Sequence, residues 1–200
     1  LPAATAGQSS AQARSWRGAP AAARTVLALL ERLTHGSLHV QWPDGSHTSH
    51  GQQGDTGTTT AAELHAHLFH VTLTIAQPAA QQRVALPAWI PGSYMVREFA
   101  KNLQNLRATQ GRRSVLVQQL DKATWQVDAA PGKPLVLTYA VYALDNSVRT
   151  AWLDASRGFF NGTSLCLRVA GQETLPHALE LMSTRATATW HVATGLPAVA

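Results

Sequence analysis

Three histidines in the run His65-Ala-His67-Leu-Phe-His70 have the residue type and spacing that metal binding requires. On a β-strand, side chains two residues apart project from the same face, so His65 and His67 would form a ligand pair and His70 would point the other way. A third ligand would have to come from elsewhere, because no cluster of Asp, Glu or Cys lies nearby. Solvent-exposed histidines at the start of a strand are the simpler interpretation.

The sequence does not indicate a serine or cysteine nucleophile. Ser93, in Pro-Gly-Ser-Tyr, lacks the G-x-S-x-G elbow that lifts a nucleophilic hydroxyl out of a strand-to-helix turn, so we interpret it as a turn residue. Cys166 alternates with Leu165 and Leu167, which is typical of a buried thiol on a strand. As the single cysteine, it excludes an internal disulfide and fits a reducing compartment, from which we predict a cytoplasmic location.

The acidic residues also suggest structure rather than chemistry. Asp145 and Asp154 stand close to Asn146 and Arg157, which indicates turns and ion pairs rather than a pair of catalytic carboxylates. Arg149 could form a stabilising ion pair with Asp154 or face a cleft, and we favour the ion pair.

The elements that would position these residues are strands. Phe69, Val71, Leu73 and Ile75 alternate with polar residues, the pattern of a half-buried strand. The same pattern predicts strands at Val84–Ile90, Ser114–Gln118, Thr124–Val127, Leu135–Ala143, Thr163–Val169, Ala178–Met182 and Thr187–Ala193, with a helical turn or two within Val96–Leu106. Many short strands between Gly, Pro and Asp turns predict a mainly β protein with an antiparallel β-sandwich or saddle domain.

The amino-terminal part follows another pattern. Val26, Leu29, Leu30 and Leu33 have helical spacing, which predicts a helix over Ala21–Leu33. A strand at Ser37–Trp42 and a turn at Pro43-Asp-Gly-Ser46 follow, and together they predict a hairpin. The domain limits that result are a disordered linker at 1–20, a helix-hairpin appendage at 21–64, the β-domain at 65–182 and a final strand at 183–200.

The helix, strand and Pro-Asp-Gly turn of residues 21–64 resemble, over about forty residues, the region before the methyltransferase domain of cyclopropane-fatty-acyl-phospholipid synthases. No G-x-G-x-x-G-like segment follows them, so a generic appendage is the alternative. The net charge of +5 is scattered rather than gathered into a stripe, which argues against nucleic acid as a partner. No apolar run approaches the ~20 residues of a membrane span.

A series of short motifs occupies the chain after residue 64: Pro87-Ala-Trp-Ile-Pro-Gly-Ser-Tyr94, Arg97-Glu-Phe-Ala100, Lys122-Ala-Thr-Trp125, Tyr139-Ala-Val-Tyr142, Ser147-Val-Arg149, Leu153-Asp154 and Phe159-Phe-Asn-Gly-Thr163. In order and spacing they resemble the amino-terminal β-domain of the glycyl aminopeptidase family of zinc metallopeptidases. Such an enzyme needs a helix carrying H-E-x-x-H, in which two histidines bind zinc and the glutamate acts as base. No His-Glu dipeptide occurs in these 200 residues. The resemblance therefore implies no cofactor in this chain, zinc in the parent enzyme, and a catalytic domain outside these residues.

The resemblance also implies that the β-domain packs over the catalytic domain and helps to close off the amino end of the substrate. An aminopeptidase must bind a free α-ammonium group and exclude longer N-terminal extensions. We predict that Asn161, Gly162 and Thr163 form the substrate-binding loop, because Asn and Gly tolerate unusual backbone angles and leave polar groups available. A plain β-turn is the alternative.

These observations predict the non-catalytic N-terminal domain of a zinc aminopeptidase that releases small N-terminal residues such as Gly or Ala. Its partners would be the catalytic peptidase domain and, in the full enzyme, a peptide substrate; the chain alone would be inactive. The alternative is a stand-alone β-sandwich interaction module without enzymatic activity. A polar surface would favour the module, whereas a large exposed apolar patch would favour an enzyme domain separated from the partner that covers it.

Overall fold

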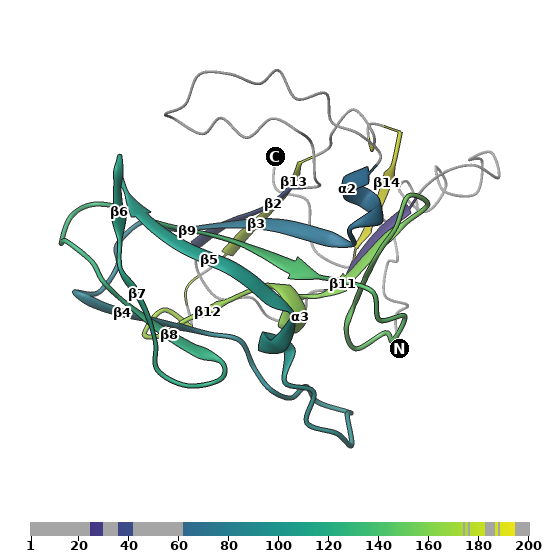
Figure 1. Ribbon diagram of the computed structural model, residues 1–200, viewed down its shortest axis with the longest axis horizontal. Helices are drawn as coiled ribbons and strands as arrows, with labels where there is room; N and C mark the ends of the chain where they lie inside the picture. The colour runs from purple at the N-terminus through teal and green to yellow at the C-terminus, as the bar shows by residue number, and fades with distance from the viewer. Residues whose placement is uncertain are drawn as a thin grey trace, which may run out of the picture.

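The computed structural model describes residues 25–29, 36–41, 62–173, 175, 177–182, 187 and 189–194. Within these residues the strands form one six-stranded and two four-stranded sheets (Figure 1). The fold is mainly β with mostly antiparallel strand pairing, consistent with a β-sandwich-like domain, and the predicted fold class is confirmed. None of the helices in the described part of the chain is long and apolar enough to cross a membrane.

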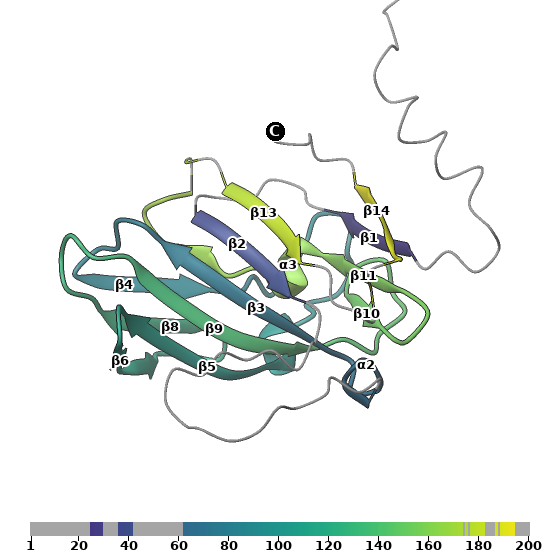
Figure 2. The same cartoon turned by 90° about the horizontal axis from the view of Figure 1, so that it is seen from above.

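The six-stranded sheet has the order β13 (His177–Met182), β2 (Gly36–Gln41), β3 (Leu68–Ile75), β9 (Leu135–Tyr142), β5 (Leu103–Gln110) and β6 (Arg113–Val115). The second sheet has the order β12 (Arg168–Val169), β4 (Gln81–Ala85), β8 (Thr124–Asp128) and β7 (Val117–Gln119), and Figure 2 shows its strands β4 and β8 behind the six-stranded sheet. The third sheet has the order β10 (Ala151–Leu153), β11 (Gly158–Asn161), β1 (Thr25–Leu29) and β14 (His191–Thr194). In the described part of the chain, three short helices connect the strands: α2 (Ala62–His65), η1 (Phe99–Asn102) and α3 (Gly162–Leu165).

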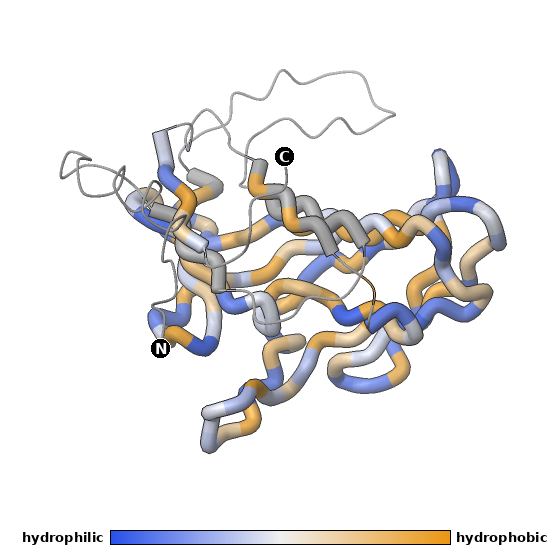
Figure 3. The backbone as a smooth tube through the Cα atoms, turned by 180° about the vertical axis from the view of Figure 1, so that it is seen from behind, coloured by the Kyte–Doolittle hydropathy of each residue, from blue (hydrophilic) through white to orange (hydrophobic). Residues whose placement is uncertain are grey.

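The core begins at the pairing of β3 with β9. The inward residues of β3 predicted from the alternation are all buried, and all four lie opposite buried residues of β9: Phe69 opposite Val141, Val71 opposite Tyr139, Leu73 opposite Leu137 and Ile75 opposite Leu135. Cross-strand apolar pairs of this kind fix the register, because a slip of one residue would turn the whole apolar set toward solvent. Figure 3 shows hydrophobic residues along these central strands.

The helix predicted over Ala21–Leu33 is wrong where the structure describes it, because Thr25–Leu29 form strand β1. β1 lies between β11 and β14 and pairs in parallel with both. A strand with parallel neighbours on both sides usually has a continuous run of apolar residues in its sequence. The periodicity of such a short run cannot distinguish a strand from a helix segment.

The strand predicted at Ser37–Trp42 is present as β2, but its neighbours are β3 and β13 rather than a hairpin partner after Pro43–Ser46. That turn, the linker at 1–20 and most of the region compared with the lipid-modifying enzymes lie outside the described residues. Because β2 pairs with β3 and β13 on its two sides, it is an internal strand of the six-stranded sheet.

One further prediction needs correction: the strand predicted at Thr163–Val169 is a helical turn, α3, followed by the two-residue strand β12. The helical turn predicted within Val96–Leu106 is confirmed as the single 3-10 turn η1, and the residues that follow it form β5 rather than a second helical turn. The register of β5 against β9 shifts between Gln104 and Arg107, where Asn105 has φ 55°. Such a bulge interrupts the alternation that marks a strand in sequence.

Candidate functional site

Asn161 ends strand β11 and caps the helical turn α3. Its carboxamide Oδ1 accepts hydrogen bonds from the backbone N–H of Thr163 at 3.1 Å and from the Thr163 hydroxyl at 2.7 Å. Asparagine is among the preferred N-cap residues because its side-chain oxygen satisfies an N–H that the first helical turn leaves unpaired. The predicted substrate-binding residues Asn161, Gly162 and Thr163 are therefore one capped turn rather than a plain β-turn.

The turn is fixed to its neighbours through backbone groups. The N–H of Asn161 donates to the Thr150 carbonyl at 3.0 Å, and the N–H of Cys166 donates to the Gly162 carbonyl at 2.7 Å. The buried Ser164 hydroxyl lies 2.6 Å from the Asn161 carbonyl and 3.0 Å from the Thr150 carbonyl, either of which can accept its proton. These bonds hold the turn against the loop that precedes β10.

Tyr139 of β9 holds the far end of the turn. Its buried hydroxyl donates to the Leu165 carbonyl at 2.8 Å and accepts from the Leu167 N–H at 3.4 Å. Burial, reinforced by the nearby Cys166 thiol, raises the pKa of Tyr139 well above its ordinary value, so the hydroxyl stays neutral. Burial likewise raises the pKa of Cys166, so this thiol is not an activated nucleophile. The predicted buried thiol is confirmed, but it lies just after α3 rather than on a strand.

The hydrogen bonds limit the chemistry that the turn can offer. The Asn161 Oδ1 and the carbonyl oxygens of Asn161 and Gly162 already accept hydrogen bonds. The Asn161 Nδ2 donates a hydrogen bond to no described residue. Asn161 and Gly162 are buried and Thr163 is partly exposed. The turn can therefore bound a ligand and offer it a donor, but the acceptors that an α-ammonium group needs would come from elsewhere.

Residues 58–200 match the family described as the peptidase M61 N-terminal domain. The chain belongs to this family. Among solved structures it is similar to the crystal structure of an aminopeptidase N family protein from Idiomarina loihiensis, with 39% sequence identity and a TM-score of 0.64 over 76% of this chain and 22% of that one. The chain thus spans about a fifth of that relative. No curated protein matches it.

The family match confirms the predicted resemblance to an N-terminal peptidase domain. The metal-ligand pair considered for His65 and His67 does not form. In this M61 N-terminal domain His65 is exposed at the end of α2. His67 adopts the left-handed conformation, φ 57°, and its Nδ1 lies 2.5 Å from the Leu153 carbonyl. Because β3 begins only at Leu68, the two side chains do not share a strand face. Among the described residues no three His, Cys, Asp or Glu side chains come together in a way that could hold a metal ion.

The turn role predicted for Ser93 is confirmed. Its hydroxyl donates to the Met95 carbonyl at 3.0 Å and accepts from the Met95 N–H and the Arg97 Nε, both at 3.3 Å. The serine is buried among these partners, and no side chain of the described residues is positioned as a base to activate it. In this M61 N-terminal domain the residue holds together the loop that carries the Pro-Gly motif.

The ion pair predicted between Arg149 and Asp154 is absent. Arg149 Nη2 donates to the Gly92 carbonyl at 3.3 Å. Asp154 accepts from the Trp152 indole and from residues 156 and 157, which makes the predicted turn. Partial burial opposes ionisation of Asp154, but the hydrogen bonds from Ser156, Trp152 and the backbone outweigh it and lower its pKa to about 2.

An open groove of about 300 Å³ lies between the η1–β5 segment and the β7–β8 hairpin. Sequence reasoning did not predict it, because it depends on the β5 bulge. The residues that line it are Ala100, Leu103, Asn105, Leu106, Val117, Gln119 and Trp125, and the surface that they present to the groove is mostly polar. The lining contains no ionisable side chain that could act as an acid or base.

Proposed function

We propose that this chain is the non-catalytic N-terminal domain of a zinc aminopeptidase that releases small N-terminal residues such as Gly or Ala. The observation that supports the proposal is the match of residues 58–200 to the peptidase M61 N-terminal domain, together with 39% identity to a protein of the aminopeptidase N family. The described residues do not assemble a metal site, so the proposal places zinc in the peptidase domain. The chemistry that zinc supplies when bound there is Lewis-acid catalysis of peptide hydrolysis.

In this proposal the Asn161–Thr163 turn forms part of the wall that bounds the amino end of the substrate. The hydrogen bonds of the cap hold the turn in one conformation. This suits the role, because a wall that excludes longer N-terminal extensions must keep its position when a substrate presses against it. The Asn161 Nδ2, which donates to no described residue, can reach a substrate carbonyl or a neighbouring acceptor. The turn thus contributes shape and one donor, and the peptidase domain contributes the reacting groups.

The test compares the 200-residue chain with the complete product of the gene that encodes it. Both proteins are assayed for zinc content and for hydrolysis of glycine and alanine p-nitroanilides. We expect hydrolysis and stoichiometric zinc from the complete protein and neither from the chain. Hydrolysis or stoichiometric zinc in the chain alone, or a complete protein without aminopeptidase activity, would contradict the proposal.

The role of the turn is tested separately with Asn161→Asp in the complete protein. Aspartate keeps the capping oxygen, so the turn is preserved, but it removes the Nδ2 donor that the proposal assigns to the substrate. We expect KM for glycine p-nitroanilide to rise roughly tenfold, which corresponds to about 1.4 kcal/mol, with kcat unchanged. Asn146→Asp is the matched control, since Asn146 is exposed and lies in the loop before β10. Equal effects of the two substitutions on KM would count against the role of the turn.

A further inference from the structure

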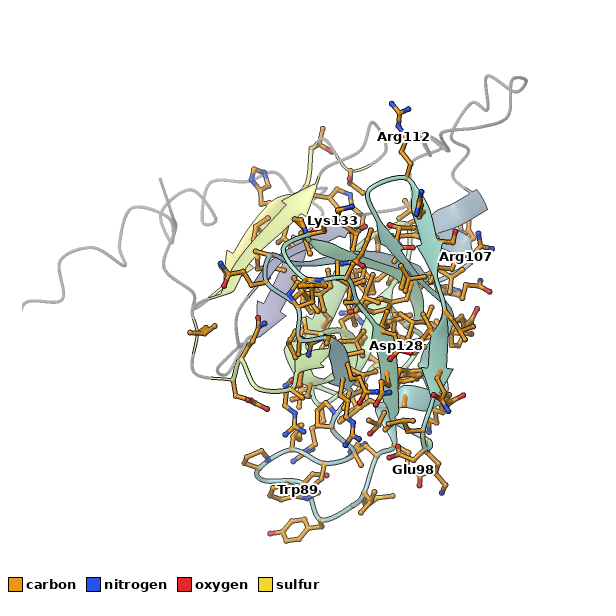
Figure 4. The ribbon with its side chains drawn as sticks, turned by 90° about the vertical axis from the view of Figure 1, so that its left-hand side faces the viewer. Trp89, Glu98, Arg107, Arg112, Asp128 and Lys133 are labelled. Carbon is orange, nitrogen blue, oxygen red and sulfur yellow. The ribbon has the colours of Figure 1, made fainter. Side chains whose placement is uncertain are left out.

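The Pro-Gly motif lies on a loop, Ala88–Glu98, that projects away from the sheets. Figure 1 shows the loop extending beyond α3, and Figure 4 places Trp89 at the end of the molecule opposite Arg112. Its two ends are joined, because the Ala88 carbonyl accepts from the Arg97 N–H at 2.7 Å and from the Glu98 N–H at 3.3 Å. A compact loop whose ends meet in this way is an Ω-loop, a class that frequently carries function.

Hydrogen bonds within the projecting loop hold it in one conformation. The Trp89 indole N–H donates to the Ser93 carbonyl at 2.6 Å, and the Ser93 N–H donates to the Ile90 carbonyl at 3.2 Å. Ser93 and Ile90 are buried, and the Ser93 hydroxyl joins Met95 and Arg97 as described above. The loop is therefore an ordered scaffold despite its projection.

The side chains that this scaffold exposes are apolar. Tyr94 is 104% exposed, Met95 64% and Val96 65%, and Trp89 is 49% exposed. The segment from Trp89 to Val96 contains no charged residue. Single apolar residues on a surface need no explanation, but a group of them on a rigid projection marks an interaction site.

The projecting loop and the Asn161 turn lie at the same end of the molecule. η1 follows the loop directly in the chain, and η1 and α3 contact each other. Arg149 connects the loop, through the Gly92 carbonyl, to the segment before β10 that also holds Asn161. A protein that meets the Asn161 turn is thereby brought to the projecting loop as well.

We propose that the projecting loop docks the peptidase domain of the same protein, with Tyr94, Met95 and Val96 covered by an apolar, uncharged surface. The inference rests on the proposed function, which requires that domain at the Asn161 turn. The solved relative also indicates an occupant in the same chain, because 78% of its length lies outside the part that this domain matches. Tyrosine and methionine are enriched at interfaces, and a preformed loop loses little conformational freedom on binding.

Oxidation of Met95 by hydrogen peroxide tests the proposal directly, because the susceptibility of methionine follows its exposure. The rate of sulfoxide formation is measured by mass spectrometry in the 200-residue chain and in the complete gene product. We expect Met95 to react roughly tenfold more slowly in the complete protein. Leu116→Met supplies a matched reference, since Leu116 is 83% exposed between β6 and β7, away from the loop, and a methionine there should react equally in both proteins.

A loop variant tests whether the shielding depends on these side chains. Tyr94→Ser combined with Val96→Ser in the complete protein should restore the oxidation rate of Met95 and speed limited proteolysis between the domains, whereas Leu116→Ser should change neither. Equal oxidation of Met95 in the chain and the complete protein would overturn the proposal. Shielding that is already present in the 200-residue chain and disappears on dilution would assign the loop to a second copy of the chain, and would also overturn it.

Aminopeptidase activity distinguishes this inference from the proposed function. An active complete protein in which Met95 stays exposed would remove the docking proposal alone. A complete protein that shields Met95 but releases no amino acid would support docking and contradict the function.

Discussion

The projecting loop and the Asn161 turn are held by the same kind of hydrogen bond, but the loop exposes apolar side chains and the turn buries polar ones. In both, side-chain oxygens pair with nearby backbone N–H groups: Ser93 with Met95 in the loop, and Asn161 with Thr163 in the turn. The loop uses these bonds to hold apolar side chains in solvent, whereas the turn uses them to bury polar atoms beside the core. Order in this domain therefore does not require burial, and the exposure of the loop is a property of its scaffold.

The largest expected difference is in the stability lost when one aromatic residue of each region is replaced by alanine. Phe160, directly before the turn, is fully buried and packs edge-to-face against Phe69 with ring centroids 5.5 Å apart. We expect Phe160→Ala to lower the free energy of unfolding by about 3–5 kcal/mol, because it leaves a cavity in the core. Urea unfolding of the 200-residue chain measures this.

Tyr94→Ala is the matched substitution in the projecting loop. Its side chain is fully exposed, so we expect a change within about 0.5 kcal/mol. Similar losses of unfolding free energy from Phe160→Ala and Tyr94→Ala would show that the loop contributes to the core and would contradict the difference between the two regions.

Tyr139→Phe should have the next largest effect. It removes one hydroxyl and leaves the buried Leu165 carbonyl and Leu167 N–H without that partner. Leaving such groups unpaired should cost about 1–3 kcal/mol. Hydrogen exchange of amides 165–167 should accelerate in the same variant, while exchange in the projecting loop should not; uniform acceleration would indicate global destabilisation instead.

Removing the cap should cost less. Asn161→Ala should destabilise the chain by about 1 kcal/mol, because the Thr163 N–H loses its acceptor. Asn161→Asp keeps that oxygen and should restore most of the loss in thermal unfolding. An alanine variant as stable as the aspartate variant would contradict the role of the cap.

The smallest effect should depend on pH and comes from Asp154. Its pKa of about 2 in the folded chain lies below the ordinary value of 3.8, so ionised Asp154 stabilises the fold above about pH 4, and this contribution is lost as pH falls toward 2. The difference in stability between the wild type and Asp154→Asn should therefore be largest above pH 4 and shrink toward pH 2. After solvent screening we expect it to stay below about 1 kcal/mol. Thermal unfolding between pH 5 and pH 2 measures it, and a difference independent of pH would contradict the assignment.

The sequence was informative wherever one face of a strand is buried. Phe69 to Ile75 and Leu135 to Ala143 show the alternation that burial imposes, and β3 and β9 lie there. It was misleading at β5, where a bulge at Asn105 breaks the alternation. At α3 the apolar run continues, but Asn161 and Tyr139 supply the hydrogen bonds that turn the backbone into a helix.

The candidate site likewise has a part that the sequence predicts and a part that it does not. The Asn161 segment could be selected from its residue types, but its cap geometry depends on partners far along the chain, such as Thr150 and Tyr139. The projecting loop contains the most recognisable motif of the sequence, yet the outward orientation of Tyr94 and Met95 follows from hydrogen bonds that no periodicity encodes.

The strand order has a consequence for how the chain folds during synthesis. Thr25 of β1 pairs with His191, and Gly36 of β2 pairs with His177, so the earliest strands acquire these partners only when the last part of the domain is made. Loop closure over such separations slows folding, while β3 can pair with β9 and β4 with β8 beforehand. A ribosome that pauses before residue 177 would therefore carry a central sheet with one side of β2 still unpaired, and that exposed edge is where a chaperone would bind.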